Sequence, residues 1–199
     1  MSAAAPTRPS RLVILISGNG TNLQAVLDAC AAGKIAARVV AVFSNQADAY
    51  GLQRARQAGV PAFHLQKTRE MDRGTYDTRL GDQTAAFSPD WVLLLGWMRI
   101  LSTAFLDRFP GRVVNLHPAL PGAFPGTHAI ERAWDAYRCG EIDRTGVMVH
   151  LVPDERVDCG PVLGQKIVPI DPDDSLETLE DRIHQAEHAL VIQVLSEIL

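Results

Sequence analysis

The chain has 199 residues, of which 47% are hydrophobic and 21% are charged, a composition typical of an ordinary folded protein with one domain. Its formal net charge of -4 provides no diffuse basic field, so neither nucleic acid nor a membrane surface is expected as a partner. Three cysteines without a CxxC pair predict free thiols and a reducing compartment, so we expect a cytoplasmic protein.

Short β-branched or aliphatic runs alternate with segments of helical spacing along the chain. After a small, polar tail at residues 1–10, predicted to be flexible, we expect strands at 12–17, 39–44, 62–65, 91–95, 113–116, 147–152 and 162–168. From about Thr145 onward short strands and turns replace the helical crossovers. The sequence therefore predicts a single-domain α/β fold with a mostly parallel, Rossmann-like open sheet, helices on both faces and mixed strands toward the C-terminus.

Glycines and capping residues mark the helix ends. The first helix has one apolar face, formed by Leu23, Val26, Leu27 and Cys30 at positions i, i+3, i+4 and i+7. Gly33 is placed to end this helix, and Gly59 to end the second. Asp174 and Glu177 resemble a capping box that opens the C-terminal helix.

The segment ISGNGTN (residues 16–22) lies between the first strand and the first helix, where backbone N–H groups and the helix dipole converge. Gly18 and Gly20 permit a tight turn and the close approach of a phosphate, while Thr21 and Asn22 add side-chain donors. The segment also fits a plain glycine-rich connection between a strand and a helix.

A dinucleotide site is a weaker match for this segment. A Rossmann fingerprint places a third glycine where this chain has Leu23, and an acidic residue at the end of the second strand where it has Ser44-Asn45. The loop therefore fits one terminal phosphate better than a pyrophosphate.

Asn115 and His117 lie at the carboxyl end of a predicted strand, where open α/β sheets bind ligands. They alternate with Leu116, so their side chains point to the same side, and an amide beside an imidazole suits oxyanion stabilisation and proton transfer. Asp158, in the loop segment RVDCGP, is expected to raise the pKa of His117 if the two lie within hydrogen-bond reach. Strand ends are also routinely polar, and an aspartate in such a loop often caps a turn.

Several motifs occur in the order and approximate spacing of the phosphoribosylglycinamide formyltransferases. They are ISGNGTN, GWMRIL (residues 96–101), NLHPAL with FPGTH, Val149-His150 and VDCGP. From about residue 11 to the end the chain resembles this family, which implies a formyltransferase fold and a catalytic domain at 11–199. The segment HPALPGAFPG departs from the family's usual HPSLLPxxPG.

The resemblance implies transfer of the formyl group of 10-formyltetrahydrofolate to the amine of glycinamide ribonucleotide, by direct attack through a tetrahedral intermediate held by Asn115 and protonated His117. It implies Asn115, His117 and Asp158 as the catalytic trio. Residues implied to bind the ribonucleotide are Gly18, Asn19, Gly20, Thr21, Asn22, Pro118 and Glu187. Residues implied on the folate side are Arg73, Met98, Arg99, Ile100, Leu101 and Asn115. No metal is implied, and the expected partners are these two small molecules, with a homodimer left open.

Four alternatives are kept. A formyltetrahydrofolate deformylase or a methionyl-tRNA formyltransferase shares the trio, but each has an additional domain for which 199 residues leave no room. The letters HQAEH (residues 184–188) spell an inverted zinc-protease motif, which needs a further acidic ligand well downstream. The fourth alternative is a protein that binds nucleotide or folate without turnover.

Overall fold

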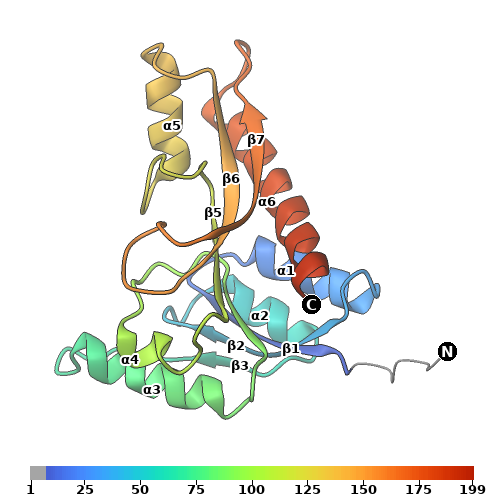
Figure 1. Cartoon of the computed structure of the whole chain (residues 1–199), viewed down its shortest axis with the longest axis vertical. Coiled ribbons are helices and arrows are strands. Elements are labelled where there is room, and N and C mark those ends of the chain that lie inside the picture. The colour runs from blue at the N-terminus through green and yellow to red at the C-terminus, as the bar shows by residue number, and fades with distance from the viewer. Residues whose placement is uncertain (1–7) are drawn as a thin grey trace.

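The aliphatic runs of the sequence form a seven-stranded sheet in the computed structural model, which describes residues 8–199 (Figure 1). The strands are β1 (Ser10–Ile16), β2 (Ala37–Ser44), β3 (Ala62–His64), β4 (Trp91–Leu94), β5 (Val113–His117), β6 (Arg144–Leu151) and β7 (Val162–Pro169). The helices are α1 (Thr21–Ala31), α2 (Tyr50–Gln57), α3 (Arg73–Ala85), α4 (Thr103–Leu106), α5 (Ala129–Arg138) and α6 (Leu176–Ile198). Each predicted strand overlaps one of the seven strands of the structure.

The strand order is β3-β2-β1-β4-β5-β6-β7. The first five strands are parallel, whereas β6 is antiparallel to β5 and β7 is antiparallel to β6, which confirms the predicted mixed end of the sheet. After β3 the chain crosses back to the other side of β1, so the strand order reverses between β1 and β4. Such a switch point leaves a crevice at the carboxyl ends of the strands, where ligands bind in open α/β sheets.

Alternation along the strands produces two hydrophobic layers, one on each face of the sheet. Leu12, Ile14 and Ile16 of β1 pack with residues of α1, α2, α5 and α6, whereas Val13 and Leu15 pack with residues of α3 and α4. Both layers consist of fully buried aliphatic and aromatic side chains, whose removal from water is the main source of folding free energy. The parallel strands are therefore covered on both faces.

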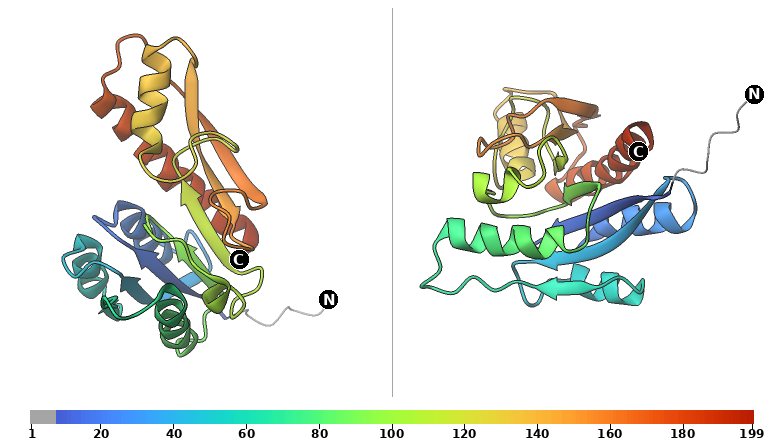
Figure 2. Two further views of the ribbon diagram at one scale, coloured as in Figure 1. Left: turned by 90° about the vertical axis from the view of Figure 1, so that its left-hand side faces the viewer. Right: turned by 60° about the horizontal axis from the view of Figure 1, so that its bottom comes forward.

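Helix α6 joins the two ends of the molecule. It has 23 residues and is about 35 Å long at 1.5 Å per residue. Figure 1 shows it running beside β6 and β7 and ending near α1, and Figure 2 shows α5, β6 and β7 standing apart from β1 to β3. Its buried side chains, from Leu179 to Leu195, belong to the same layer as α1.

Glycines end the first two helices as predicted. Gly33 and Gly59 have φ of +66° and +71°, and their N–H groups donate to the carbonyls of Cys30 and Arg56. The predicted tail at 1–10 falls largely outside the described residues. Of its last three residues, Ser10 already belongs to β1. Within residues 8–199, no helix has the length and apolar character needed to cross a membrane.

The predicted capping box of α6 is wrong by one residue. The helix begins after Ser175, whose side chain accepts from the N–H of Thr178 while the Thr178 hydroxyl accepts from the N–H of Ser175. Asp174 instead accepts hydrogen bonds from Arg182 and from the Thr178 hydroxyl. Two adjacent residues of the kinds that favour N-caps cannot be ranked by sequence alone.

Tyr76 of α3 provides a test of the layer between the sheet and α3. Its side chain is fully buried, its hydroxyl donates to the Leu65 carbonyl at 3.0 Å, and burial raises its pKa to about 12. Tyr76→Phe leaves that buried carbonyl without this donor and is expected to lower the free energy of unfolding by about 1 to 3 kcal/mol. Urea denaturation measures the loss. The matched change Tyr50→Phe, at an exposed tyrosine, is expected to alter stability by less than about 0.5 kcal/mol.

Candidate active site at the carboxyl ends of β1, β4 and β5

The loops that follow β1, β2 and β4 are tied together by one serine. The hydroxyl of Ser17 donates to the Asn45 side chain at 2.6 Å and accepts from the N–H of Met98 at 2.9 Å. These three residues directly follow, or lie close behind, the ends of three neighbouring strands. Ser17 therefore holds the glycine loop and the segment 97–101 in a fixed relation at the switch point. Sequence reasoning did not single out Ser17, because nothing in the sequence pairs it with residues 28 and 81 positions away.

The glycine loop at residues 18–22 leads into α1 and leaves the N-terminus of that helix uncapped. Gly20 has φ of +76° and forms the N-cap of α1, without a side-chain cap on the first helical N–H groups. These donors are therefore available to a ligand, in the positive field of the helix N-terminus. Gly18 and Asn19 are exposed, and a Cβ on Gly18 would meet no atom within 4 Å.

The start of α1 is linked to α6. Asn22 Nδ2 donates to Glu187 Oε2 at 3.3 Å, and the same oxygen lies 2.8 Å from His184 Nδ1. Glu187 is buried, and its hydrogen bond is the largest cause that raises the pKa of His184. The structure thus brings Glu187, predicted on the ribose side, next to the predicted phosphate loop.

Asn115, His117 and Asp158 lie together near the carboxyl end of β5. Asn115 Nδ2 donates to Asp158 Oδ1 at 3.0 Å, and His117 Nδ1 lies 3.4 Å from Asp158 Oδ2. Asp158 Oδ2 also accepts from the N–H of Gly126 at 2.8 Å. The carboxylate therefore connects β5 to two loops that are separated by 32 residues in the chain.

His150 is a fourth member of this cluster. It lies opposite Asn115 in the β5–β6 register, with Nε2 3.1 Å from Asn115 Nδ2 and 3.4 Å from Asp158 Oδ1. Its Nδ1 lies 2.8 Å from the Leu151 carbonyl, which can only accept, so Nδ1 carries a proton. The sequence contained a signal for this residue in the motif Val149-His150, but strand direction was needed to place the ring beside Asn115.

The protonation of His117 results from two opposing effects. Its two ring nitrogens face acceptors, Asp158 and the Phe124 carbonyl at 3.1 Å, so only the doubly protonated ring donates to both. Burial nevertheless lowers the pKa of His117 below its ordinary value, and the raising effects of Asp158 and of Phe124 only partly offset it. Asp158 raises the pKa of His117 as expected, but the net shift in the free protein is downward, because the desolvation of an almost fully buried ring outweighs its charged neighbour.

The pKa of Asp158 is lowered in the same cluster. Burial raises it, but the adjacent His150 ring, the hydrogen bond from the Gly126 N–H and the imidazole of His117 together outweigh that effect. Asp158 is therefore a carboxylate at neutral pH. It is the negative charge that the imidazole of His117 faces.

Strained backbone surrounds the cluster. Four non-glycine residues within 8–199 have a left-handed backbone, and three of them lie here: Phe124, His128 and Asp158. Phe124 supplies the carbonyl that faces His117, and Asp158 has φ of +52°. Such conformations cost free energy and concentrate at functional sites. The segment that departs from the usual family pattern thus folds directly onto His117.

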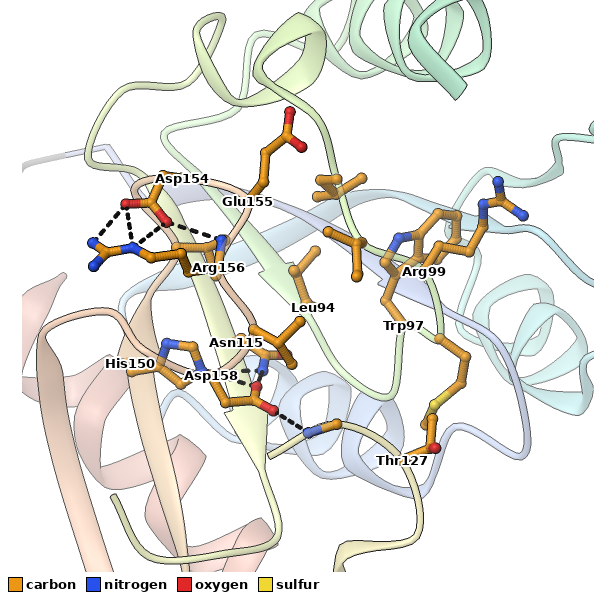
Figure 3. Close-up of a pocket in the computed structure, with 16 residues that line it drawn as sticks. Leu94, Trp97, Arg99, Asn115, Thr127, His150, Asp154, Glu155, Arg156 and Asp158 are labelled. Atoms are coloured by element: carbon orange, nitrogen blue, oxygen red, sulfur yellow. Dashed lines mark hydrogen bonds and ion pairs between the residues drawn. The ribbon is translucent and has the colours of Figure 1, made fainter. Parts of the chain in front are cut away.

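A pocket of about 370 Å³ opens beside the cluster (Figure 3). One wall is the segment from Trp97 to Leu101, the other is the loop from Val152 to Asp158, and Asn115 lies at its floor. Met98 and Ile100 are 63% and 50% exposed, so this wall presents apolar side chains to solvent. A pocket with apolar walls and several polar groups is typical of a small-molecule site.

The two arginines predicted on the folate side have different surroundings. Arg99 lines the pocket and its guanidinium lies over the Tyr76 ring, 4.8 Å from the centroid. Arg73 does not line the pocket; its Nη2 pairs with Glu155 Oε2 at 2.8 Å, and Glu155 does line it. Pro118 follows His117, is partly buried and does not line the pocket either.

The HQAEH segment lies within α6, and His184 and Glu187 are paired to each other. Among residues 8–199 no group of three or more His, Cys, Asp or Glu side chains is arranged to hold a metal ion.

Comparison with known proteins identifies the class of this site. Residues 10–195 match the family model described as formyl transferase, so the chain belongs to that family. It is 43% identical over 195 residues to the phosphoribosylglycinamide formyltransferase of Dictyostelium discoideum, covering 92% of this chain and 94% of that protein. The protein of the same name from Escherichia coli (strain K12) is 44% identical over 185 residues, which cover 93% and 85%.

Solved structures agree with this assignment. Glycinamide ribonucleotide transformylase 1 from Symbiobacterium toebii has a TM-score of 0.90 and 39% identity, covering 98% of this chain and 90% of that one. Phosphoribosylglycinamide formyltransferase from Bacillus halodurans has a TM-score of 0.88 and 34% identity, covering 95% of each chain. Within its family the chain groups with the phosphoribosylglycinamide formyltransferases, which confirms the resemblance seen in the motifs.

The opposing effects on His117 are separable by titration. NMR of the ring in the free protein is expected to give a pKa below 6.5. Asp158→Asn removes a charge that raises this pKa and is expected to lower it further. A pKa for His117 that is unchanged or higher in Asp158→Asn would contradict the described geometry.

The same shift predicts a dependence of stability on pH. Because the folded pKa of His117 lies below the unfolded value of 6.5, the unfolded chain binds the proton first as the pH falls. The contribution of His117 to stability is therefore present above pH 6.5 and is lost as the pH falls toward the folded pKa. His184, whose pKa is raised, has the opposite effect on stability. The measurement is therefore the slope of the free energy of unfolding against pH, compared between wild type and His117→Gln.

Proposed function

We propose that this protein transfers the formyl group of 10-formyltetrahydrofolate to the amine of glycinamide ribonucleotide, giving formylglycinamide ribonucleotide and tetrahydrofolate. The observation that carries the proposal is the cluster of Asn115, His117 and Asp158 near both the uncapped start of α1 and a pocket with apolar walls. An enzyme that joins a phosphorylated acceptor to a folate donor needs both sites on either side of its reacting groups. The names of the relatives point to the same acceptor.

The acceptor is assigned to the loop side. The first N–H groups of α1 bind the ribonucleotide phosphate. The carboxylate of Glu187 lies next to Asn22 at the start of α1, so it accepts hydrogen bonds from the ribose hydroxyls beside that phosphate. The donor is assigned to the pocket, where Met98 and Ile100 provide an apolar surface for a pterin ring. Trp97 also lines this pocket, and its buried indole N–H has no hydrogen-bond partner within residues 8–199.

His117 is assigned the proton transfers. The acceptor amine attacks the formyl carbon only in its neutral form, and a neutral imidazole can take up the proton that the nitrogen releases. The lowered pKa of His117 supplies that neutral ring at pH 7. Once charged, the imidazolium donates to Asp158 through Nδ1 and offers the Nε2 proton to the tetrahedral oxyanion or the departing folate nitrogen. This path requires the Phe124 carbonyl to leave Nε2 first.

Asn115 is assigned the second donor to the oxyanion. In the free protein its Nδ2 contacts both Asp158 and His150, so both of its N–H groups have a partner. Because Asn115 lines the pocket, an oxyanion bound there takes one of these N–H groups in place of His150.

The remaining expectations belong to this proposal. We place the enzyme in the cytoplasm, with two small-molecule substrates and no metal. A homodimer is retained as an expectation that size measurements in solution would decide.

Variants of the trio test the assigned roles. His117→Ala and Asp158→Asn are each expected to lower kcat by about a hundredfold to a thousandfold, because each removes a group worth about 3 to 4 kcal/mol in the transition state. Turnover is followed by the absorbance change as formyl folate is converted to tetrahydrofolate. Asp135→Asn, on the exposed side of α5, is the control and is expected to retain wild-type kcat. Wild-type kcat in either trio variant, with folding verified by circular dichroism, would overturn the roles.

Dependence on the acceptor tests the reaction itself. Folate deformylation by the wild-type enzyme is expected only when glycinamide ribonucleotide is present, with one formylated product per folate released. Turnover in its absence, with formate as product, would instead identify a deformylase. Tight folate binding without turnover under either condition would identify a binding protein.

A further inference from the structure

The glycine loop rests on one arginine of the neighbouring helix α2. Arg54 Nε donates to the Asn19 carbonyl at 2.9 Å, and Arg54 Nη2 donates to the Asn19 side-chain oxygen at 2.8 Å. Arg54 Nη1 lies 3.5 Å from Gln24 Oε1 of α1. A planar guanidinium thus holds both ends of one loop residue in the fork geometry that only arginine provides.

The loop and α2 are also in steric contact. A Cβ on Gly20 would lie 2.7 Å from the Cα of Gly51, and the N–H of Gly51 donates to the Gly18 carbonyl at 3.1 Å. The Arg54 guanidinium is itself supported by the Tyr50 ring, 4.8 Å from its centroid. The first turns of α2 therefore form a platform that fixes the path of residues 18–20.

The charge of Arg54 matters because the protein as a whole does not attract anions. The formal net charge is -4, and Glu187 places a buried carboxylate near the other end of the loop. Among residues 8–199, Arg54 is the only lysine or arginine that makes a side-chain hydrogen bond to residues 18–22. Three of its five N–H donors have partners in Asn19 and Gln24. The other two N–H donors of this charged group have no partner within residues 8–199 and lie beside the loop.

We propose that Arg54 is a positioning residue for the phosphate of the acceptor. It fixes Asn19 so that the N–H groups of the loop and of α1 point to one place, and it supplies the positive charge that selects a phosphorylated acceptor over a neutral one. The inference rests on the proposed function, because the acceptor phosphate is assigned to this loop.

The test compares two acceptors in two variants. Arg54→Gln is expected to lower kcat/KM for glycinamide ribonucleotide by about tenfold to a hundredfold, the usual effect of losing charged hydrogen bonds, through a higher KM with kcat retained. For the ribonucleoside, which lacks the phosphate, kcat/KM is expected to change by less than twofold. Arg54→Lys keeps the positive charge but not the forked donors, so its kcat/KM for the ribonucleotide is expected to lie between those of Arg54→Gln and wild type.

Arg56 provides the matched control. It lies two positions away on α2, is exposed and makes no side-chain hydrogen bond within residues 8–199, so Arg56→Gln is expected to leave both acceptors unaffected. The KM of wild type for the ribonucleotide is expected to rise with added KCl more steeply than that of Arg54→Gln, because one phosphate-facing charge is gone.

The outcomes separate this inference from the proposed function. Wild-type enzyme that fails to formylate glycinamide ribonucleotide overturns the function. Wild-type turnover with an unchanged kcat/KM in Arg54→Gln overturns the role of Arg54. Equal losses with the ribonucleotide and the ribonucleoside also overturn it, since a general structural role would lower both.

Discussion

The carboxylate of Asp158, which is only 9% exposed, makes the interactions on which the site depends. It contacts Asn115 and His117 of β5, His150 of β6 and the N–H of Gly126, so one side chain joins two strands and two loops. A buried charge is tolerated only when its oxygens are satisfied, and here the partners also fix the orientation of both imidazoles. His117 and Asp158 also act on each other, because the carboxylate raises the pKa of His117 and the imidazole lowers the pKa of Asp158.

The sheet explains why these residues meet. The strand order reverses between β1 and β4, which places the loops after β1 and β4 on either side of one crevice. Strand β5 lies next to β4, and its antiparallel neighbour β6 brings His150 opposite Asn115. Parallel strands alone would have delivered only strand ends to this edge. The antiparallel pair adds a residue from within a strand.

The sequence predicted the parts of this arrangement that depend on local chemistry. Seven strands, the glycine loop and the trio all follow from periodicity, from turn residues and from recognisable motifs. The parts that it did not predict depend on contacts between distant residues or on the degree of burial. Arg54 and Arg56 look alike in sequence, and only the position of α2 against the loop separates them. The net direction of the His117 pKa shift belongs to the second group, because it depends on burial, for which the sequence has no signal of comparable precision.

The left-handed backbone of Asp158 has a consequence for how this protein evolves. An L residue with φ of +52° costs about 1 kcal/mol relative to glycine, which adopts this conformation freely. Mutational drift under selection for a stable chain alone would favour glycine at position 158, and glycine would also avoid burying a charge. Glycine, however, could neither accept from Asn115 and Gly126 nor face His117 with a charge. At this position the stability of the chain and the construction of the site therefore favour different residues.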